Sequence, residues 1–224
     1  MRWIETNEIS ISVGKYITLH GNLKIPFGAS SLVIFSHGSG SSRFSTRNNY
    51  VAGILNKEKI ATLLTDLLTE REDNVFENRF NINLLTDRLV AVTSYAHQMP
   101  ELKKLPIGYF GASTGAASAL QAAVQLSDII HVVVSRGGRP DLAKTLNQVK
   151  APTLLIVGSL DTQVIELNEQ AYSLLRCEKK TEIIEGASHL FEESGKLDEV
   201  AVMATQWFKK YLLSSKFKTH DVQK

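Results

Sequence analysis

One serine in this 224-residue sequence lies in a context that favours nucleophilic chemistry. Ser113 is the centre of Gly111-Ala112-Ser113-Thr114-Gly115, which has the pattern GxSxG. A serine on a tight strand-to-helix turn needs small residues two positions before and after it, so that neighbouring backbone can pass close while the hydroxyl stays exposed. Gly111 and Gly115 meet that need. The alternative is that Ser113 merely caps the following helix, because serine is a favoured N-cap and short motif matches occur by chance.

A serine hydroxyl is a poor nucleophile at neutral pH and needs a base within hydrogen-bond reach, which a carboxylate orients. In enzymes that place the serine on such a turn, the acid and then the histidine follow it in the chain. Three histidines follow Ser113: His131, His189 and His220. His131 begins a predicted buried strand and His220 belongs to the tail. His189, in a loop after the last short strand, is therefore the predicted base, and its alternative is a structural role in that loop.

The acid is expected in a loop after a central strand, between the serine and the histidine. Asp161 lies just beyond the predicted strand Leu154–Val157, in Gly158-Ser159-Leu160-Asp161, and its alternative role is to cap the helix that comes next. Asp141 competes, but in Pro140-Asp141-Leu142 it has the place of an acid in a first helical turn, where it favours the helix dipole. We therefore predict Asp161 as the acid.

The tetrahedral intermediate of such a reaction carries an oxyanion that needs backbone N–H donors placed in advance. The N–H of Thr114 follows the nucleophile, and the second donor is expected in the loop after the first buried strand. In that loop, His37–Ser42, we nominate Ser39 and then Gly40. The alternatives are a flexible turn and a dinucleotide fingerprint, but the third glycine position of that fingerprint is Arg43.

Three arginines indicate where a charged substrate would bind. Arg136 and Arg139 follow a predicted strand, at the sheet edge where ligands of open α/β sheets bind, and Arg43 follows the oxyanion loop. Guanidinium groups bind carboxylate or phosphate in a forked geometry. We hypothesise an anionic substrate held by Arg136 or Arg139. The alternative is that these arginines bind loop carbonyls or pair with Asp66, Asp141 or Glu70.

These residues require a particular succession of helices and strands. Two alternating segments, 9–13 and 16–20, joined across Gly14-Lys15, predict an antiparallel hairpin with a two-residue turn. Short apolar runs typical of strands buried on both faces then alternate with helical patterns. The runs are 32–35, 60–64, 107–110, 129–134 and 154–157, followed by a short strand at 181–184 and a terminal helix from about 197 to 213. We predict an α/β fold whose mostly parallel sheet of about eight strands has an antiparallel N-terminal edge and helices on both faces.

Composition limits the function classes. With 43% hydrophobic and 21% charged residues we expect one domain over residues 1–215 and a flexible basic tail at 216–224. A net charge of +2 disfavours nucleic acid as a partner. The first residues hold no apolar leader, no run is long enough to span a membrane and Cys177 is the single cysteine, so we expect a cytoplasmic protein without a membrane partner. No phosphate-loop or zinc spacing occurs, so no cofactor or metal is implied.

Together these motifs resemble the dienelactone-hydrolase-like branch of the α/β-hydrolases, in particular a bacterial group sometimes joined to a phosphoribosyltransferase domain. The resemblance covers nearly the whole chain. The segments that carry it are Ser36–Arg43, Thr65–Glu70, Gly108–Ala117, Ser135–Asp141 and Gly186–Phe191. It implies an α/β-hydrolase fold without a large cap domain, and a serine hydrolase that cleaves a small ester, thioester or lactone. Dienelactone hydrolase itself has a cysteine as the nucleophile on the strand-to-helix turn, which we call the elbow. Its lactone substrate therefore does not carry over to a chain with Ser113.

Two other functions stay open. A non-catalytic module of this fold that docks on a phosphoribosyltransferase would need no chemistry, but such a module has no reason to retain nucleophile, acid and base together. A lyase that uses the same groups as a base is also compatible with the sequence. The sequence does not identify the substrate. It is compatible with a homodimer and with a phosphoribosyltransferase partner, and decides neither.

Overall fold

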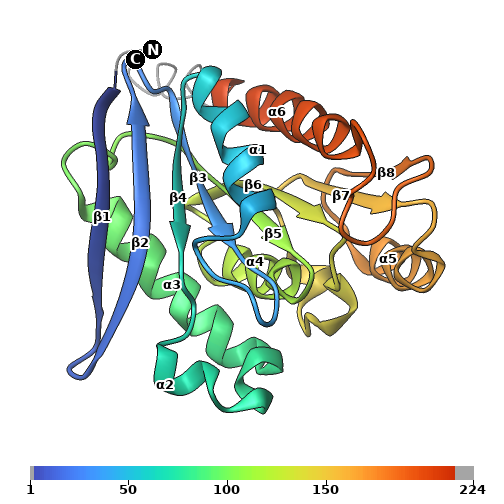
Figure 1. The fold of residues 1–224 in the computed structure, drawn as a ribbon, viewed down its shortest axis with the longest axis horizontal. Helices are drawn as coiled ribbons and strands as arrows, with labels where there is room; N and C mark the ends of the chain where they lie inside the picture. Colours follow the sequence, from blue (N-terminus) through green and yellow to red (C-terminus); the bar gives the residue numbers. More distant parts are fainter. Residues whose placement is uncertain (1–2, 215–224) are drawn as a thin grey trace, which may run out of the picture.

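The computed structural model describes residues 3–214, which form an eight-stranded sheet with helices on both faces (Figure 1). The sheet order is β1-β2-β4-β3-β5-β6-β7-β8. The strands are β1 (Trp3–Val13), β2 (Ile17–Pro26), β3 (Ser31–Ser36), β4 (Ile60–Thr65), β5 (Ile107–Ala112), β6 (Ile130–Arg136), β7 (Thr153–Gly158) and β8 (Lys179–Ile184). The α-helices are α1 (Thr46–Lys57), α2 (Glu70–Asp73), α3 (Ile82–Gln98), α4 (Thr114–Gln125), α5 (Thr162–Leu174) and α6 (Lys196–Ser214). The predicted tail at 216–224 lies outside the described residues.

The predicted fold class is confirmed. β1 and β2 pair antiparallel at one edge and β2 pairs antiparallel with β4, whereas all pairs from β4 to β8 are parallel. Every residue of β3, β4, β5 and β7 is buried, which explains their continuous apolar runs. Between β6 and β7 lie two short 3-10 helices, η2 (Pro140–Leu142) and η3 (Leu146–Gln148), so no large cap interrupts the sheet there.

The N-terminal hairpin differs from its prediction in the turn. Val13 pairs with Ile17, so the turn has three residues, from Gly14 to Tyr16, where two were expected. Gly14 has a φ of 61°, a left-handed conformation that glycine adopts without steric cost. Both strands are also longer than predicted: β1 begins at Trp3 and β2 ends at Pro26. In β2, buried residues continue to alternate with less buried ones through Leu23.

Two separate clusters of apolar side chains pack on the two faces of the sheet. α3, α4 and α5 cover one face, where Leu89 and Leu120 are fully buried or nearly so. α1 and α6 lie side by side on the other face, where Leu55 and Phe208 are fully buried (Figure 1). Because the strands from β3 to β8 are parallel, their carboxyl ends and the loops that follow meet at one edge. Within residues 3–214, none of the helices combines the length and apolarity that crossing a membrane would need.

Candidate active site

Ser113 occupies a strained turn between β5 and α4. Its φ is 50° and its ψ is −124°, a backbone conformation that a residue with a side chain rarely adopts. Ser113 stands at the N-cap position of α4, yet its side chain makes no capping hydrogen bond. The hydroxyl is therefore not used to stabilise the helix, which disfavours the capping role considered as the alternative.

The glycines on either side of Ser113 allow backbone to pass very close. A Cβ added to Gly115 would lie 2.2 Å from the carbonyl oxygen of Ser36, and one added to Gly111 would lie 2.5 Å from the Cα of Ala116. Real Cβ atoms do not approach other atoms this closely. The spacing of the motif therefore has the steric cause expected from the sequence.

Asp161 and His189, 28 residues apart, form a hydrogen bond of 2.6 Å between a carboxylate oxygen and Nδ1. Since a carboxylate accepts, Nδ1 is the donor, which leaves Nε2 as the unprotonated nitrogen of the neutral ring. Asp161 is at the N-cap position of α5 but makes no capping bond with its side chain. The competing Asp141 instead pairs with Arg139.

The loops after β7 and β8 meet through their backbones, and this contact brings the acid and the base together. A Cβ on Gly158 would lie 2.2 Å from the carbonyl oxygen of Ala187. The N–H of Leu160 donates to that same carbonyl at 3.0 Å, and the N–H of Gly186 donates to the Ser159 hydroxyl at 2.8 Å. The position of His189 relative to Asp161 is thus set by the loops that carry both residues.

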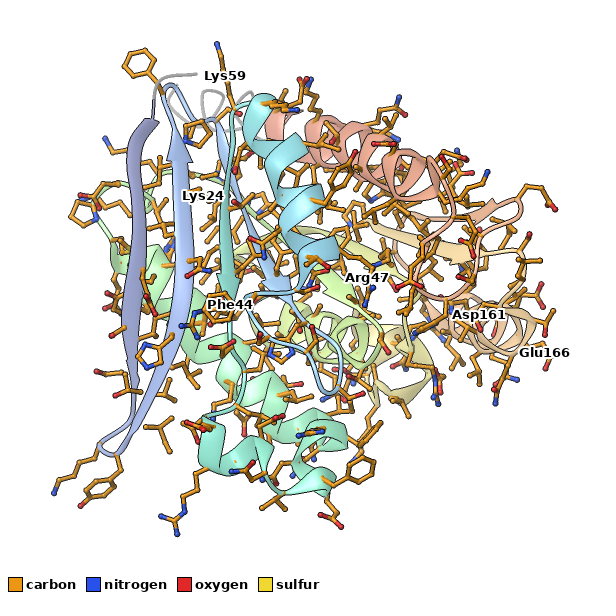
Figure 2. All side chains as sticks on the ribbon, in the orientation of Figure 1. Lys24, Phe44, Arg47, Lys59, Asp161 and Glu166 are labelled. Carbon is orange, nitrogen blue, oxygen red and sulfur yellow. The ribbon has the colours of Figure 1, made fainter. Side chains whose placement is uncertain are left out.

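Ser113 and His189 line one cavity of about 260 Å³ at the carboxyl edge of the sheet. Ser39, Arg47 and Arg136 also face it. Its remaining lining residues are Gly38, Ser41, Ser45, Asn48, Ala112 and Leu190. The structure therefore gathers the predicted nucleophile, base and oxyanion loop around one volume, with two arginines beside them. Figure 2 shows Arg47 on α1 and Asp161 at the start of α5 on this same side of the molecule.

The oxyanion loop lies directly against the nucleophile. A Cβ on Gly38 would lie 2.9 Å from the Cβ of Ser113. Ser39 lines the cavity, whereas a Cβ on Gly40 would point toward Arg79, 3.8 Å away. Ser39 is thus better placed than Gly40 to supply the second donor. Thr114, the residue proposed for the first donor, directly follows the nucleophile and is the first residue of α4.

Arg136 is a buried cation beside the nucleophile. It is 6% exposed, its Nη2 donates to the Asn48 side chain at 3.1 Å, and its Nε is buried with no partner among the described residues. Among the described side chains, those of residues 8–213, no carboxylate forms an ion pair with it. Burial and, to a lesser degree, the charge of Arg47 lower the pKa of Arg136 to about 10. A buried guanidinium without a counterion is a site that an anion would stabilise.

The other two predicted substrate-binding arginines are engaged elsewhere. Arg139 makes a forked contact with Asp141, at 2.9 and 2.8 Å. The guanidinium of Arg43 pairs with Asp66, and with Glu8 at 2.7 Å. These pairs correspond to the alternative weighed in the sequence, in which such arginines bind nearby acids.

Sequence reasoning missed Arg47 and Asn48. Both lie in the first turn of α1, which Ser45 caps, and Arg47 also pairs with Glu192 of the histidine loop at 2.9 Å. Asn48 is buried and touches Arg136 across 88 residues of chain. The sequence signal that could have identified these two residues is the N-cap Ser45. A helix that begins soon after the oxyanion loop must present its first turn to the same edge of the sheet.

His131, the other described histidine after Ser113, does not line this cavity. The Nδ1 of His131 donates to the Ile129 carbonyl at 2.7 Å at the start of β6, and His220 lies outside the described residues. Over residues 3–214 no three His, Cys, Asp or Glu side chains group as a metal site would require.

No family model matches the sequence. Three known proteins show what the chain is similar to. A solved dienelactone hydrolase from Anabaena variabilis is 51% identical, with a TM-score of 0.89 over 93% of this chain and 98% of that one. The esterase Est1E from Butyrivibrio proteoclasticus, 18% identical with a TM-score of 0.77 over 91% of this chain and 98% of that one, shares the fold. A Mycobacterium tuberculosis protein provisionally named a phosphoribosyl transferase is 47% identical over 206 residues, which are 92% of this chain and 46% of that protein.

Proposed function

This chain belongs to the dienelactone hydrolase family of α/β-hydrolases, as its motifs indicated, and from that relationship we propose that it is a serine hydrolase that cleaves a small ester through an acyl-enzyme. The observation that carries the proposal is the Asp161–His189 hydrogen bond of 2.6 Å, with His189 lining the same cavity as the strained Ser113. A structural histidine would have no need of a partly buried carboxylate partner in the same cavity as a strained serine whose hydroxyl does not cap its helix.

In the first half of the reaction, Ser113 Oγ attacks the carbonyl carbon of the ester while Nε2 of His189 takes the hydroxyl proton. Asp161 holds the ring in the tautomer that leaves Nε2 free and stabilises the imidazolium that forms. The carbonyl oxygen becomes an oxyanion, for which the N–H groups of Thr114 and Ser39 are the proposed donors. The bond to the alkoxy group then breaks, and the imidazolium returns its proton to the departing alcohol.

In the second half, water attacks the acyl carbon of the Ser113 ester and gives its proton to His189. The tetrahedral intermediate collapses, the bond to Ser113 breaks, and the serine recovers the proton from the imidazolium. The products are the carboxylic acid and a regenerated enzyme. Thioesters and lactones would use the same groups: in a thioester the leaving atom is sulfur, and in a lactone the leaving oxygen stays attached to the acyl group.

The proposed substrate carries a negative charge. Arg136 supports this part of the proposal, because it lines the cavity that contains Ser113 and is a buried cation without a carboxylate partner among the described side chains. Arg47, at 32% side-chain exposure, lines the same cavity, but its charge is paired with Glu192 at 2.9 Å. Guanidinium groups bind carboxylates and phosphates in a forked geometry, so an ester with either group fits.

A phosphoribosyltransferase partner is a separate proposal, supported by the mycobacterial relative. The present chain spans 46% of that protein's length. We propose that a hydrolase unit of this kind works beside a phosphoribosyltransferase unit in such proteins. A module that only docks there would not require the Asp161–His189 contact.

The test is covalent labelling of the purified protein with a fluorescent fluorophosphonate, with the adduct located by peptide mass spectrometry, alongside turnover of short-chain nitrophenyl esters. We expect labelling at Ser113 and turnover, both lost in Ser113→Ala. Ser173→Ala is the matched control, because Ser173 is exposed on α5 and bonds its own helix. A folded wild-type protein that is neither labelled nor active would overturn the proposal and favour the docking module.

A further inference from the structure

His37 is a buried histidine that the reaction described above does not use. It directly follows β3 and is 7% exposed. Its Nδ1 lies 2.9 Å from the carbonyl oxygen of Gly38, and the N–H of Leu67 donates to its Nε2 at 3.1 Å. Because a carbonyl only accepts and an amide N–H only donates, the ring is neutral with its proton on Nδ1. Both ring nitrogens are thus committed.

The Gly38 carbonyl and the Ser39 N–H belong to the same peptide group. That group is planar, so in a trans peptide its oxygen and its hydrogen point in opposite directions. His37 holds the oxygen from one side, and the N–H of Ser41 donates to the same oxygen at 3.2 Å. Two donors that fix the carbonyl therefore also fix the direction of the Ser39 N–H.

The residues on the two sides of the Gly38 carbonyl line different cavities. His37 lines a cavity of about 170 Å³ with Asp66 and Asp73. Ser39 lines the cavity of Ser113 and His189. A carbonyl held on the His37 side places the Ser39 N–H on the side of the nucleophile.

We propose that His37 is a positioning residue, which holds the Ser39 N–H in the oxyanion-binding orientation before any substrate arrives. This inference rests on the proposed function, since it acts through the oxyanion of that reaction. It predicts a preformed site that needs no peptide flip during catalysis.

The surroundings keep the ring in the required neutral form. Burial lowers the pKa of His37, against the smaller raising effects of its bond to Gly38 and of the Asp66 and Asp73 charges. A protonated ring would present a hydrogen to the Leu67 N–H and lose that bond. The neutral ring alone can donate to Gly38 and accept from Leu67 together.

Two substitutions separate the two bonds. In His37→Asn the amide nitrogen can occupy the place of Nδ1 and keep donating to Gly38, while the bond to Leu67 is lost. In His37→Gln the longer side chain can keep accepting from Leu67, while the bond to Gly38 is lost. We expect His37→Gln to lower kcat about 30- to 100-fold with KM within about threefold, since an oxyanion donor acts mainly in the transition state. We expect His37→Asn to keep kcat within about threefold of the wild type.

Equal losses of kcat in the two variants, or a loss confined to KM, would overturn the proposal. Melting temperatures report whether each variant folds. If either does not, nitrogen-15 NMR of the wild-type histidines gives the second test: we expect the Nδ1–H tautomer of His37 both free and with a boronic acid on Ser113, and an Nε2–H tautomer or a change between states refutes it. Wild-type labelling at Ser113 tests the proposed function separately, so the two failures are distinguishable.

Discussion

Both halves of the site depend on close backbone contacts at glycine, but the acid–base half also depends on a side-chain hydrogen bond. On the nucleophile side, at the ends of β3 and β5, positions depend on backbone contacts that only glycine permits, at Gly38, Gly111 and Gly115. On the acid–base side, at the ends of β7 and β8, Gly158 makes such a contact with Ala187, and the Asp161–His189 hydrogen bond is added to it. There the Asp161 side chain is 16% exposed and that of His189 is 39% exposed.

This difference predicts two kinds of sensitivity. Added volume should damage the nucleophile side, because a packed interior has no room to absorb even one methyl group. A change of hydrogen-bonding chemistry at constant volume should damage the acid–base side, because the ring is oriented by one carboxylate. The predictions below probe this contrast, beginning with the largest effect.

Replacing Asp161 by asparagine tests the acid–base side at constant volume. An amide NH₂ facing Nδ1 would favour the tautomer with the proton on Nε2, which cannot accept the serine proton. We expect kcat to fall about 10⁴-fold while the melting temperature changes little. Steady-state kinetics and thermal melts measure both.

Asp141→Asn is the matched control for that experiment, because Asp141 pairs with Arg139 and lies outside the cavity lining. We expect activity within about twofold of the wild type. If the Asp141 variant lost activity and the Asp161 variant kept it, the acid would be reassigned.

Gly38→Ala tests the nucleophile side with one methyl group. The new Cβ would lie 2.9 Å from the Ser113 Cβ and 3.2 Å from the Ala112 carbonyl, so either the elbow or the oxyanion loop must move. We expect a loss of about 10²-fold in kcat, similar to the removal of one oxyanion donor, together with a lower melting temperature. The same kinetics and melts apply.

Gly53→Ala controls for the substitution itself. Gly53 lies inside α1, and a Cβ there would meet no atom within 4 Å. Alanine is favoured over glycine in a helix by about 0.5 to 1 kcal/mol, so this variant should melt slightly higher with unchanged kcat. A Gly38 variant that behaved like the Gly53 variant would remove the proposed contrast between the two halves.

The same contrast explains what the sequence could predict. The elbow was predictable because its constraint is local: two glycines at fixed distances from a serine, between a strand and a helix. Asp161 was distinguishable from Asp141 because Asp161 lies just beyond a predicted strand, whereas Pro140-Asp141-Leu142 has the pattern of a first helical turn. The apolar runs were equally informative, since β3, β4, β5 and β7 are buried on both faces.

The arginines were not predictable in the same way. Arg139 and Arg43 have the residue type and the loop positions of anion-binding groups, but each has an acid within reach. The contact between Arg136 and Asn48 joins two elements that are distant in the chain, and no short spacing encodes such a contact. Which guanidinium stays without a counterion depends on packing between elements, which a single sequence does not specify.

Arg136→Met tests the anion site, with an effect smaller than those above. We expect kcat/KM to fall about tenfold for an ester with a carboxylate and to stay within about twofold for a neutral ester of similar size. The variant should also melt higher, because it removes a buried charge without a counterion. Unchanged preference between the two esters would contradict the assignment of Arg136.

The stability difference of that variant should depend on pH in a defined direction. Burial lowers the pKa of Arg136 to about 10 in the folded protein, below its usual value, so the folded state loses this proton first. Below pH 10 the guanidinium is charged in both states and the full cost of burying it is present. As the pH rises above 10 this cost declines, so the advantage of the methionine variant should shrink there.

Arg139→Gln should have the smallest effect. The guanidinium of Arg139 pairs with Asp141, and partly exposed ion pairs contribute about 0 to 1 kcal/mol. Arg139 does support the elbow, but through its backbone N–H, which donates to the Ser113 carbonyl at 3.0 Å and is retained in glutamine. We therefore expect unchanged kcat and an unchanged preference between charged and neutral esters, measured beside Arg136→Met. A loss of preference here would mean that the Asp141 pair opens when substrate binds, and that the anion site extends to both arginines after β6.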